Sequence, residues 1–308
     1  MKKNFNDEQR KEILELGEAG FSYHEISLYV HGQYNIMVTD DCIRKIIKRS
    51  KPRKSKKDNT QEKCLILSDL HIPYHRDDIL EIVKSHAKEI DTLVIAGDCV
   101  DCESISKFKE LGKIPLIDEM VIAHSVLKAI EDLTPGVKRY VIYGNHEERF
   151  VKYLATYDNS LNPLHSSNIL QEIIGGFQKH DHRLGQTTVY SGLDYEVIDQ
   201  WHMQLNDLII AHPSGFSKIP GRTVSNACEY FTRNGFVFNA VMIGHTHKII
   251  EKLPNLNKWC YEIGCLAKDM PYASGGKLGY TPQNPGYAIA VFNERQFDVN
   301  ASKIYCLN

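Results

Sequence analysis

Five short apolar runs in the sequence each end in residues that bind metals or transfer protons. In chain order these residues are Asp69, His71, Asp98, Asp101, Asn145, His146, Glu147, His212, His245 and His247. A single Asp or His at the end of a strand is most often a cap or a turn residue. Burying several of them together without a cation would carry repeated desolvation costs. Mixed carboxylate and imidazole ligands suit manganese, iron or zinc, so the pattern predicts a pair of divalent metal ions.

The spacing of these residues is also informative. It reads D-x-H at 69–71, G-D-x-x-D at 97–101, G-N-H-E at 144–147, a lone His212, and G-H-x-H at 244–247. In this order the motifs resemble those of the calcineurin-like metallophosphoesterases, a resemblance that should extend over residues 62–308. The resemblance implies an α/β fold built as a four-layer α/β/β/α sandwich. It also implies hydrolysis of a phosphoester with two divalent metal ions, manganese first, with iron, zinc, nickel or magnesium as alternatives.

The resemblance further implies a role for each motif residue. The metal ligands would be Asp69, His71 and His247 for one ion, Asn145, His212 and His245 for the other, and Asp98 as the bridge between them. A hydroxide bridging the two ions would attack phosphorus in line, while the metals polarise the phosphoryl oxygens. His146 would donate a proton or hydrogen bond near the leaving oxygen, Asp101 would orient His146, and Glu147 would give structural support.

Other polar residues near the motifs are candidates for binding the substrate, with solvation at the surface as the alternative for each. They are Arg149, Arg222, Lys218 and His75. We expect His124 in the core and predict no role for His180 and His182, which lie in what reads as a polar loop. Cys102 stands where the protein serine/threonine phosphatases of this family carry a phosphate-binding Arg. Protein phosphatase activity is therefore not expected.

The elements that must position these residues follow from the apolar pattern. The runs at 64–70, 92–98, 139–145, 207–213 and 240–246 predict strands. Segments 78–90 and 118–133, which lie between the first three runs, have helical periodicity. Strands that alternate with helices predict an α/β sheet, a fold that places its chemistry in the loops at strand ends.

The first 50 residues read as a separate unit of three helices. Ser22 and Glu25 have the spacing of a capping box ahead of the second helix. The stretch "AGFSYHEIS…VTDDCIRKIIKR" resembles a helix-turn-helix domain of the kind fused to phage and mobile-element proteins. That resemblance implies a third helix in a DNA major groove. Asp40 and Asp41 at its start favour the alternative, a small protein-contact module. The basic residues placed to contact DNA are Arg44, Lys45, Lys48 and Arg49.

Charge separates this N-terminal part from the rest of the chain. Residues 1–60 contain 13 Lys and Arg against 9 Asp and Glu, a net +4, and the total of −2 leaves −6 for the remainder. Such asymmetry indicates an anionic partner for the N-terminal part. We expect this partner to be nucleic acid, in particular DNA. We therefore predict a helix-turn-helix-like domain at 1–50, a basic linker at 51–61 and a metallophosphoesterase domain at 62–308.

Composition limits the setting of the protein. No apolar run approaches the ~20 residues that a membrane helix needs, so no membrane partner is expected. The N-terminus lacks the apolar region of a secretory signal, and eight scattered cysteines suit reduced thiols. We expect a cytoplasmic protein of a bacterial cell or a phage-infected host, and the sequence predicts no oligomeric state.

Three functions fit these features. The first is a nuclease or phosphodiesterase acting on DNA, because a tethered DNA-binding unit would raise the local concentration of nucleic acid near the metals. The second is a phosphatase or cyclic-nucleotide phosphodiesterase with a small nucleotide-like substrate. The third is a DNA-binding regulatory protein with a phosphoesterase scaffold, which the complete set of ligands argues against. An open basic groove would favour the first and a capped pocket the second, and residues 150–201 are expected to form the cap or the wall.

Overall fold

The computed structural model describes residues 5–18, 20–34, 36–50, 61–107, 113–157, 168–268 and 283–307. The chain divides into two units, residues 1–58 and 59–308. Of the predicted linker at 51–61, only Gln61 falls within the described ranges, where it is the first residue of a strand.

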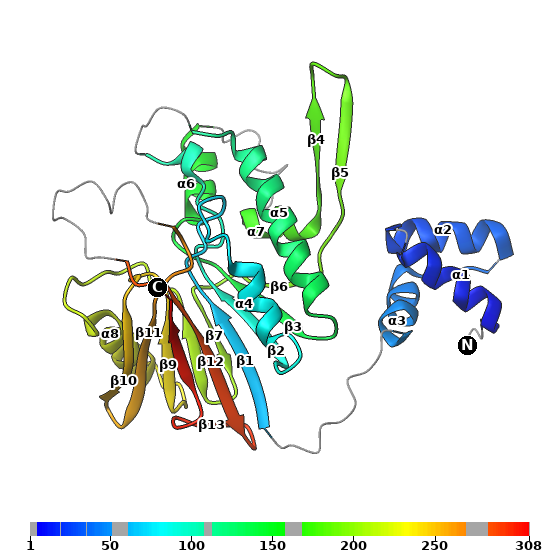
Figure 1. The fold of residues 1–308 in the computed structure, drawn as a ribbon. Helices are drawn as coiled ribbons and strands as arrows, with labels where there is room; N and C mark the ends of the chain where they lie inside the picture. The colour runs from blue at the N-terminus through cyan, green and yellow to red at the C-terminus, as the bar shows by residue number, and fades with distance from the viewer. Residues whose placement is uncertain are drawn as a thin grey trace. The chain divides into compact units, whose positions relative to one another are not determined.

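The N-terminal unit consists of helices α1 (Asp7–Glu18), α2 (Tyr23–Tyr34) and α3 (Asp40–Ser50) (Figure 1). The predicted capping box at the start of α2 is confirmed. The Glu25 amide donates to Ser22 Oγ at 3.2 Å, and the Ser22 amide donates to Glu25 Oε2 at 2.8 Å. The three helices are held together by a small apolar core, which contains Phe5, Ile13, Ile26, Val30 and Ile43.

The first sheet of the larger unit has a parallel centre. Its parallel strands are β1 (Gln61–Leu67), β2 (Thr92–Ala96), β3 (Lys138–Ile142) and β6 (Glu196–Ile198). Strand β12 (Gly286–Asn293) pairs antiparallel with β1 and carries β13 (Gln296–Phe297) and β14 (Lys303–Cys306). The order is β13-β12-β1-β2-β3-β6, so the first three predicted strands are neighbours.

The second sheet holds the other two predicted strands, β8 (Leu208–Ala211) and β9 (Ala240–Ile243), side by side and parallel. The remaining strands are β7 (His202–Leu205), β10 (Ile249–Asn255) and β11 (Lys258–Ile263). The order is β10-β11-β9-β8-β7.

Alternating apolar side chains build a core on both faces of each sheet. On β1, Ile66 packs between the two sheets, whereas Leu65 packs beneath the helices α4 (Ile79–His86), α5 (Leu116–Leu133) and α7 (Ile169–Gly175). Helix α8 (Arg222–Arg233) covers the outer face of the second sheet (Figure 1). The predicted four-layer α/β/β/α sandwich is therefore confirmed.

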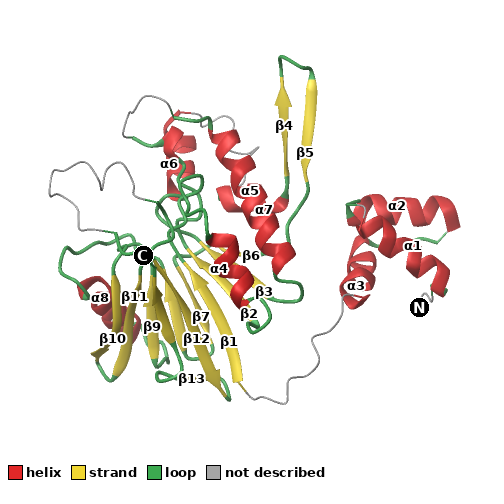
Figure 2. Ribbon diagram, viewed as in Figure 1, coloured by secondary structure: helices red, strands yellow, loops and turns green. Residues whose placement is uncertain are grey.

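The segment from 150 to 201 contributes α6 (Glu148–Tyr157), α7 and a hairpin of β4 (Phe177–Asp181) and β5 (Gln186–Tyr190). The hairpin pairs with no further strand among the described residues, and Figure 2 shows it extending away from the two sheets. His180 lies in β4, so the prediction of a polar loop there was wrong. Across the described ranges, no helix combines the length and apolar character needed to cross a membrane.

Candidate metal centre

The two sheets bring the ends of five strands together. Asp69, Asp98 and Asn145 follow β1, β2 and β3, and because these strands are parallel their carboxyl ends share one edge. His212 and His245 follow the parallel strands β8 and β9. Potential ligand atoms lie within 4.8 Å of one another in three overlapping groups, which are Asp69–His71–His247, His71–Asp98–His146 and Asp98–His212–His245.

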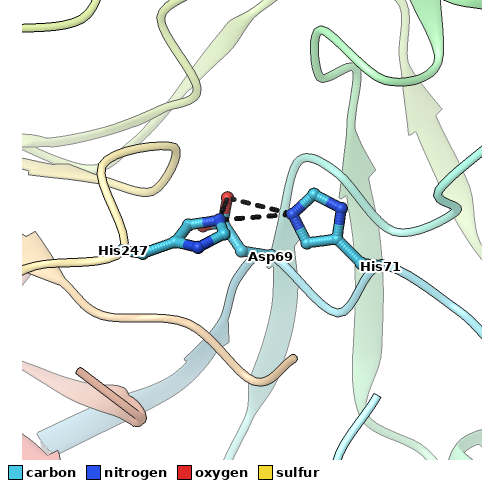
Figure 3. Close-up of side chains that lie close together, drawn as sticks. All are labelled: Asp69, His71 and His247. Atoms are coloured by element: carbon cyan, nitrogen blue, oxygen red, sulfur yellow. Dashed lines mark hydrogen bonds and ion pairs between the residues drawn. The ribbon is translucent and has the colours of Figure 1, made fainter. Parts of the chain in front are cut away.

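The first group comes from the loops after β1 and β9 (Figure 3); Asp69 and His71 are buried, and His247 is half-buried. His247 Nε2 lies 3.1 Å from Asp69 Oδ1 and 3.2 Å from His71 Nε2. His71 Nε2 lies 3.9 Å from the same carboxylate oxygen. Two imidazole nitrogens and a carboxylate oxygen therefore converge on one point, as the ligands of a cation do.

The third group is assembled around His212. Its Nε2 lies 3.2 Å from Asp98 Oδ2 and 3.3 Å from Asn145 Oδ1. Its Nδ1 donates to the Ala96 carbonyl at 2.7 Å, which leaves the Nε2 lone pair for a ligand. His245 Nε2 is buried and has no hydrogen-bond partner among the described residues. A buried nitrogen with an unused lone pair is costly unless a cation takes it, so this donor set fits a divalent metal.

The opposite charges of these carboxylates and imidazoles shift one another's pKa values. Burial raises the pKa of Asp98, but His212 and His146 outweigh burial and hold this pKa well below its ordinary value. Burial lowers the pKa of His212, but Asp98 and Asp69 raise it to about 9. Burial and His212 together lower the pKa of His245 to about 4. The Asp98 carboxylate is thus ionised, and a positive charge beside it, such as that of a metal ion, would stabilise it.

The backbone at this centre is strained. Five of the clustered residues have positive φ: Asp69 (53°), His71 (47°), Asp98 (46°), His245 (73°) and His247 (53°). Few residues other than glycine adopt the left-handed region, and such strain persists where the surroundings impose it. Holding these side chains in the cluster therefore lowers the stability of the fold, and such strain is typical of a functional centre.

His146 belongs to the remaining group, with His71 and Asp98, and so lies beside the other two. Its Nδ1 is 2.9 Å from Asp101 Oδ1, and the same oxygen is 2.9 Å from His71 Nδ1. Arg149 donates to the Asp101 carbonyl at 2.7 Å, and its Nη2 lies 3.0 Å from His146 Nε2. Burial lowers the pKa of His146, but Asp98 and Asp101 outweigh burial, and the pKa is raised. Asp101 thus holds two imidazoles, and Arg149 lies at the nitrogen that faces the centre.

Glu147 braces the loops that carry the ligands. Its Oε1 accepts from the Val100 amide at 3.0 Å and its Oε2 from the Gly144 amide at 2.9 Å. Burial and the nearby Asp98 raise its pKa to about 7. These contacts are those of a residue that ties the second motif to the third.

Some predicted residues lie away from these groups. Arg222 is the exposed first residue of α8, Lys218 is exposed in the loop after β8, and His75 forms a bridge with Ala267. No described contact connects any of the three to the clustered ligands. His124 is buried as expected, with its Nε2 donating to the Ser191 carbonyl at 2.7 Å.

The basic residues of α3 are described only in part. Arg44 and Lys45 are exposed, whereas the side chains of Lys48 and Arg49 lie outside the described part of the chain. Asp40 accepts a hydrogen bond from Ser27 at 2.8 Å, so this carboxylate helps to join α3 to α2.

Two residues at the centre were not anticipated from the sequence. Ser68 donates to Asp69 Oδ2, and Gln283 Nε2 lies 2.6 Å from His247 Nδ1. Ser68 adjoins the first motif, but serine there is too common to be a signal. Gln283 comes from a distant segment that carries no motif, so only the structure reveals its contact.

Comparison with known proteins identifies the family of the chain. Residues 63–249 match the model of the family described as calcineurin-like phosphoesterase. No curated protein matched the chain. A metallophosphoesterase from Sphaerobacter thermophilus is 15% identical, with a TM-score of 0.39 over 80% of this chain and 88% of that one. A dimetal phosphatase from Danio rerio is 11% identical, with a TM-score of 0.39 over 80% of this chain and 99% of that one. Vps29 from Entamoeba histolytica is 12% identical, with a TM-score of 0.37 over 80% of this chain and 99% of that one. Because the family match covers more than half of the residues, the chain belongs to the calcineurin-like phosphoesterase family.

Proposed function

We propose that this chain is a metal-dependent phosphodiesterase that cleaves nucleic acid, with DNA as its first substrate. The observation that carries hydrolysis is the overlap of the three donor groups, which share His71 and Asp98 and include His146. The preference for DNA is supported by the N-terminal unit, where α3 exposes Arg44 and Lys45. Basic side chains on a helix are suited to phosphate contacts.

Two divalent ions would be held by residues from all five strand ends. One ion would bind Asp69, His71 and His247, the other Asn145, His212 and His245, and Asp98 would contact both. When bound, such ions supply an activated water and neutralise the phosphoryl oxygens. Carboxylate, amide and imidazole ligands together favour manganese, iron or zinc over calcium.

His146 would act as the proton donor. Asp101 fixes its Nδ1, so Nε2 points towards Asp98 Oδ2 at 3.9 Å and towards Arg149. A substrate phosphate entering here would draw the Arg149 guanidinium onto a phosphoryl oxygen. Nε2, which accepts from Arg149 in the structure, would then be free to take up a proton from solvent, which the raised pKa of His146 favours, and to pass it to the leaving oxygen.

The N-terminal unit would supply affinity for the polymer. In this proposal it is a helix-turn-helix domain whose α3 enters the major groove, with Arg44 and Lys45 near the phosphates.

The test is Mn²⁺-dependent cleavage of linear and circular DNA, in single- and double-stranded form. His146→Ala and Asp98→Ala serve as the inactive controls. Cleavage that is lost in both variants is the expected result, and the circular substrates separate endonuclease from exonuclease action. If no DNA is cleaved while bis(p-nitrophenyl) phosphate is hydrolysed, the substrate is instead a small nucleotide-like ester.

A further inference from the structure

A hollow leads away from the donor group around His212. It has a volume of about 210 Å³, and its lining includes Asn145, His212 and Trp201. A second hollow of about 340 Å³ adjoins it and shares Trp201, Pro213 and Gly215 with it. The two form one groove that begins at candidate metal ligands, and together they are in the size range of ligand sites.

The outer part of this groove has three aromatic walls, Trp201, Phe216 and Tyr230, which we call the aromatic groove. Phe216 and Tyr230 are each 48% exposed. None of the described residues that line this outer hollow carries a charge, and Asn226 offers an exposed amide. Exposed rings beside an uncharged amide suit a planar, neutral, hydrogen-bonding group and not a phosphate.

The walls are fixed to the metal centre. The Trp201 carbonyl accepts from the His212 amide at 2.7 Å, and the Trp201 ring stacks on Phe231 with centroids 5.0 Å apart. The Phe216 ring meets the His245 ring edge to face, with centroids 6.2 Å apart.

Lys248 holds the loop that carries Phe216. Its Nζ donates to the carbonyls of Ser217 and Lys218 at 2.9 and 3.1 Å, and it lies 4.8 Å from the centre of the Phe216 ring. The position of the Phe216 ring is therefore set in advance of any ligand.

We propose that the aromatic groove binds an unpaired nucleobase that is joined to the phosphate at the metal centre. This inference rests on the proposed function, since it assigns the base-binding part of the same site. Base stacking on an aromatic side chain contributes ~1–3 kcal/mol per base, which is about 5- to 150-fold in affinity. A base already paired in a duplex cannot enter, so single-stranded substrates are preferred.

The chain offers its own reporter for this groove. Its two tryptophans are Trp201 and Trp259, and Trp259 is the second residue of β11, at the end of the second sheet opposite the candidate ligands. Trp259→Leu leaves Trp201 as the only tryptophan of the full-length protein. His146→Ala, added to this background, suppresses cleavage during a titration.

The experiment titrates this protein with a thymidine dinucleotide and with its abasic counterpart, which has the same sugar–phosphate backbone. The dinucleotide should quench Trp201 fluorescence, and the abasic compound should not. Phe216→Leu with Tyr230→Leu should weaken binding of the dinucleotide at least fivefold. Thermal unfolding should be nearly unchanged, because both rings are half exposed.

Equal responses to the two ligands, or unchanged affinity in the Phe216→Leu/Tyr230→Leu protein, would overturn the inference. Hydrolysis of methyl p-nitrophenyl phosphate, measured with His146 intact, tests the proposed function separately. Base-dependent quenching without such hydrolysis would support the groove and contradict the phosphodiesterase. Hydrolysis without base-dependent quenching would support the phosphodiesterase and contradict base binding in the groove.

Discussion

At the scale of single residues, two histidines of the centre differ in what surrounds their Nε2 atoms. His212 Nε2 lies between Asp98 and Asn145, whereas His146 Nε2 faces Arg149. His146→Gln should lower kcat by about 10²–10⁴ because a general acid is lost. It should leave the bound Mn²⁺ unchanged, as measured by equilibrium dialysis.

His212→Gln is the matched variant, since the same substitution is made at a candidate ligand. It should lower both kcat and the bound Mn²⁺. If His146→Gln released as much metal as His212→Gln, the assignment of His146 as a proton donor would be wrong.

A second residue-scale prediction concerns Glu119, a buried residue of α5. Its Oε1 accepts from the Ser104 amide at 3.3 Å, and its Oε2 has no partner among the described residues. Burial raises its pKa from 4.5 to about 7. The folded chain therefore keeps a proton that the unfolded chain releases, so stability is greatest below pH 4.5 and falls as pH rises towards 7.

Glu119→Gln mimics the protonated side chain and should remove this loss. From pH 5 to pH 8, the free energy of unfolding of the wild type should therefore fall by ~1–3 kcal/mol more than that of the variant. Urea titrations of both proteins at the two pH values measure this difference. An equal change with pH in the two proteins would show that Glu119 is ionised in the fold.

At the scale of elements, the turn after β9 leaves no room for a side chain at its glycine. A Cβ atom on Gly244, just after β9, would lie 1.8 Å from Ser68 Oγ and 2.7 Å from Asp69 Oδ2. Gly244→Ala should therefore separate the ends of β1 and β9 and lower the free energy of unfolding by about 1–3 kcal/mol or more.

Gly175, the last residue of α7, is the matched control. A Cβ atom there meets nothing within 4 Å, and its φ is not positive. Gly175→Ala should leave stability unchanged or slightly higher. Urea unfolding measures both variants, and equal stabilities would contradict the close approach of the two strands.

The elements also explain what the sequence could predict. Buried runs such as 92–98 and 240–246 are apolar up to a polar terminus, and this pattern alone indicated both the strands and the edge where the residues meet. Strands β4 and β5 are mostly exposed, so they lack the alternation that marks a half-buried strand and read as loop.

Contacts between distant segments could not be predicted in the same way. Gln283 reaches His247, and the aromatic groove combines Trp201, Phe216 and Tyr230. No periodic pattern relates such residues, because only the packing of the second sheet and α8 brings them together. Local motifs predicted the residues of the centre, with Asp101 and Glu147 as supporting residues, whereas no motif indicated Gln283 or the aromatic groove.

At the scale of the whole molecule, the proposal assigns affinity for DNA to one unit and hydrolysis to the other. Arg44→Ala with Lys45→Ala should weaken DNA binding and reduce the slope of log K against log salt by about 2, since each phosphate contact contributes ~0.9. Hydrolysis of bis(p-nitrophenyl) phosphate should not change.

Lys11→Ala is the control for this prediction, because Lys11 is an exposed basic residue on α1, paired only with Glu15 at 3.6 Å among the described ion pairs. Its salt slope should equal that of the wild type. If the α3 variant kept the wild-type slope, the DNA contact would lie elsewhere.

The central claim is that the clustered carboxylates and imidazoles hold divalent metals for phosphoester hydrolysis. The most direct measurement is the rate of bis(p-nitrophenyl) phosphate hydrolysis by EDTA-treated protein as Mn²⁺ is added back, for the wild type and His212→Gln. Without metal no hydrolysis should occur; added Mn²⁺ should restore hydrolysis in the wild type and restore little of it in His212→Gln. Full activity in EDTA, or equal recovery in the two proteins, would contradict the claim.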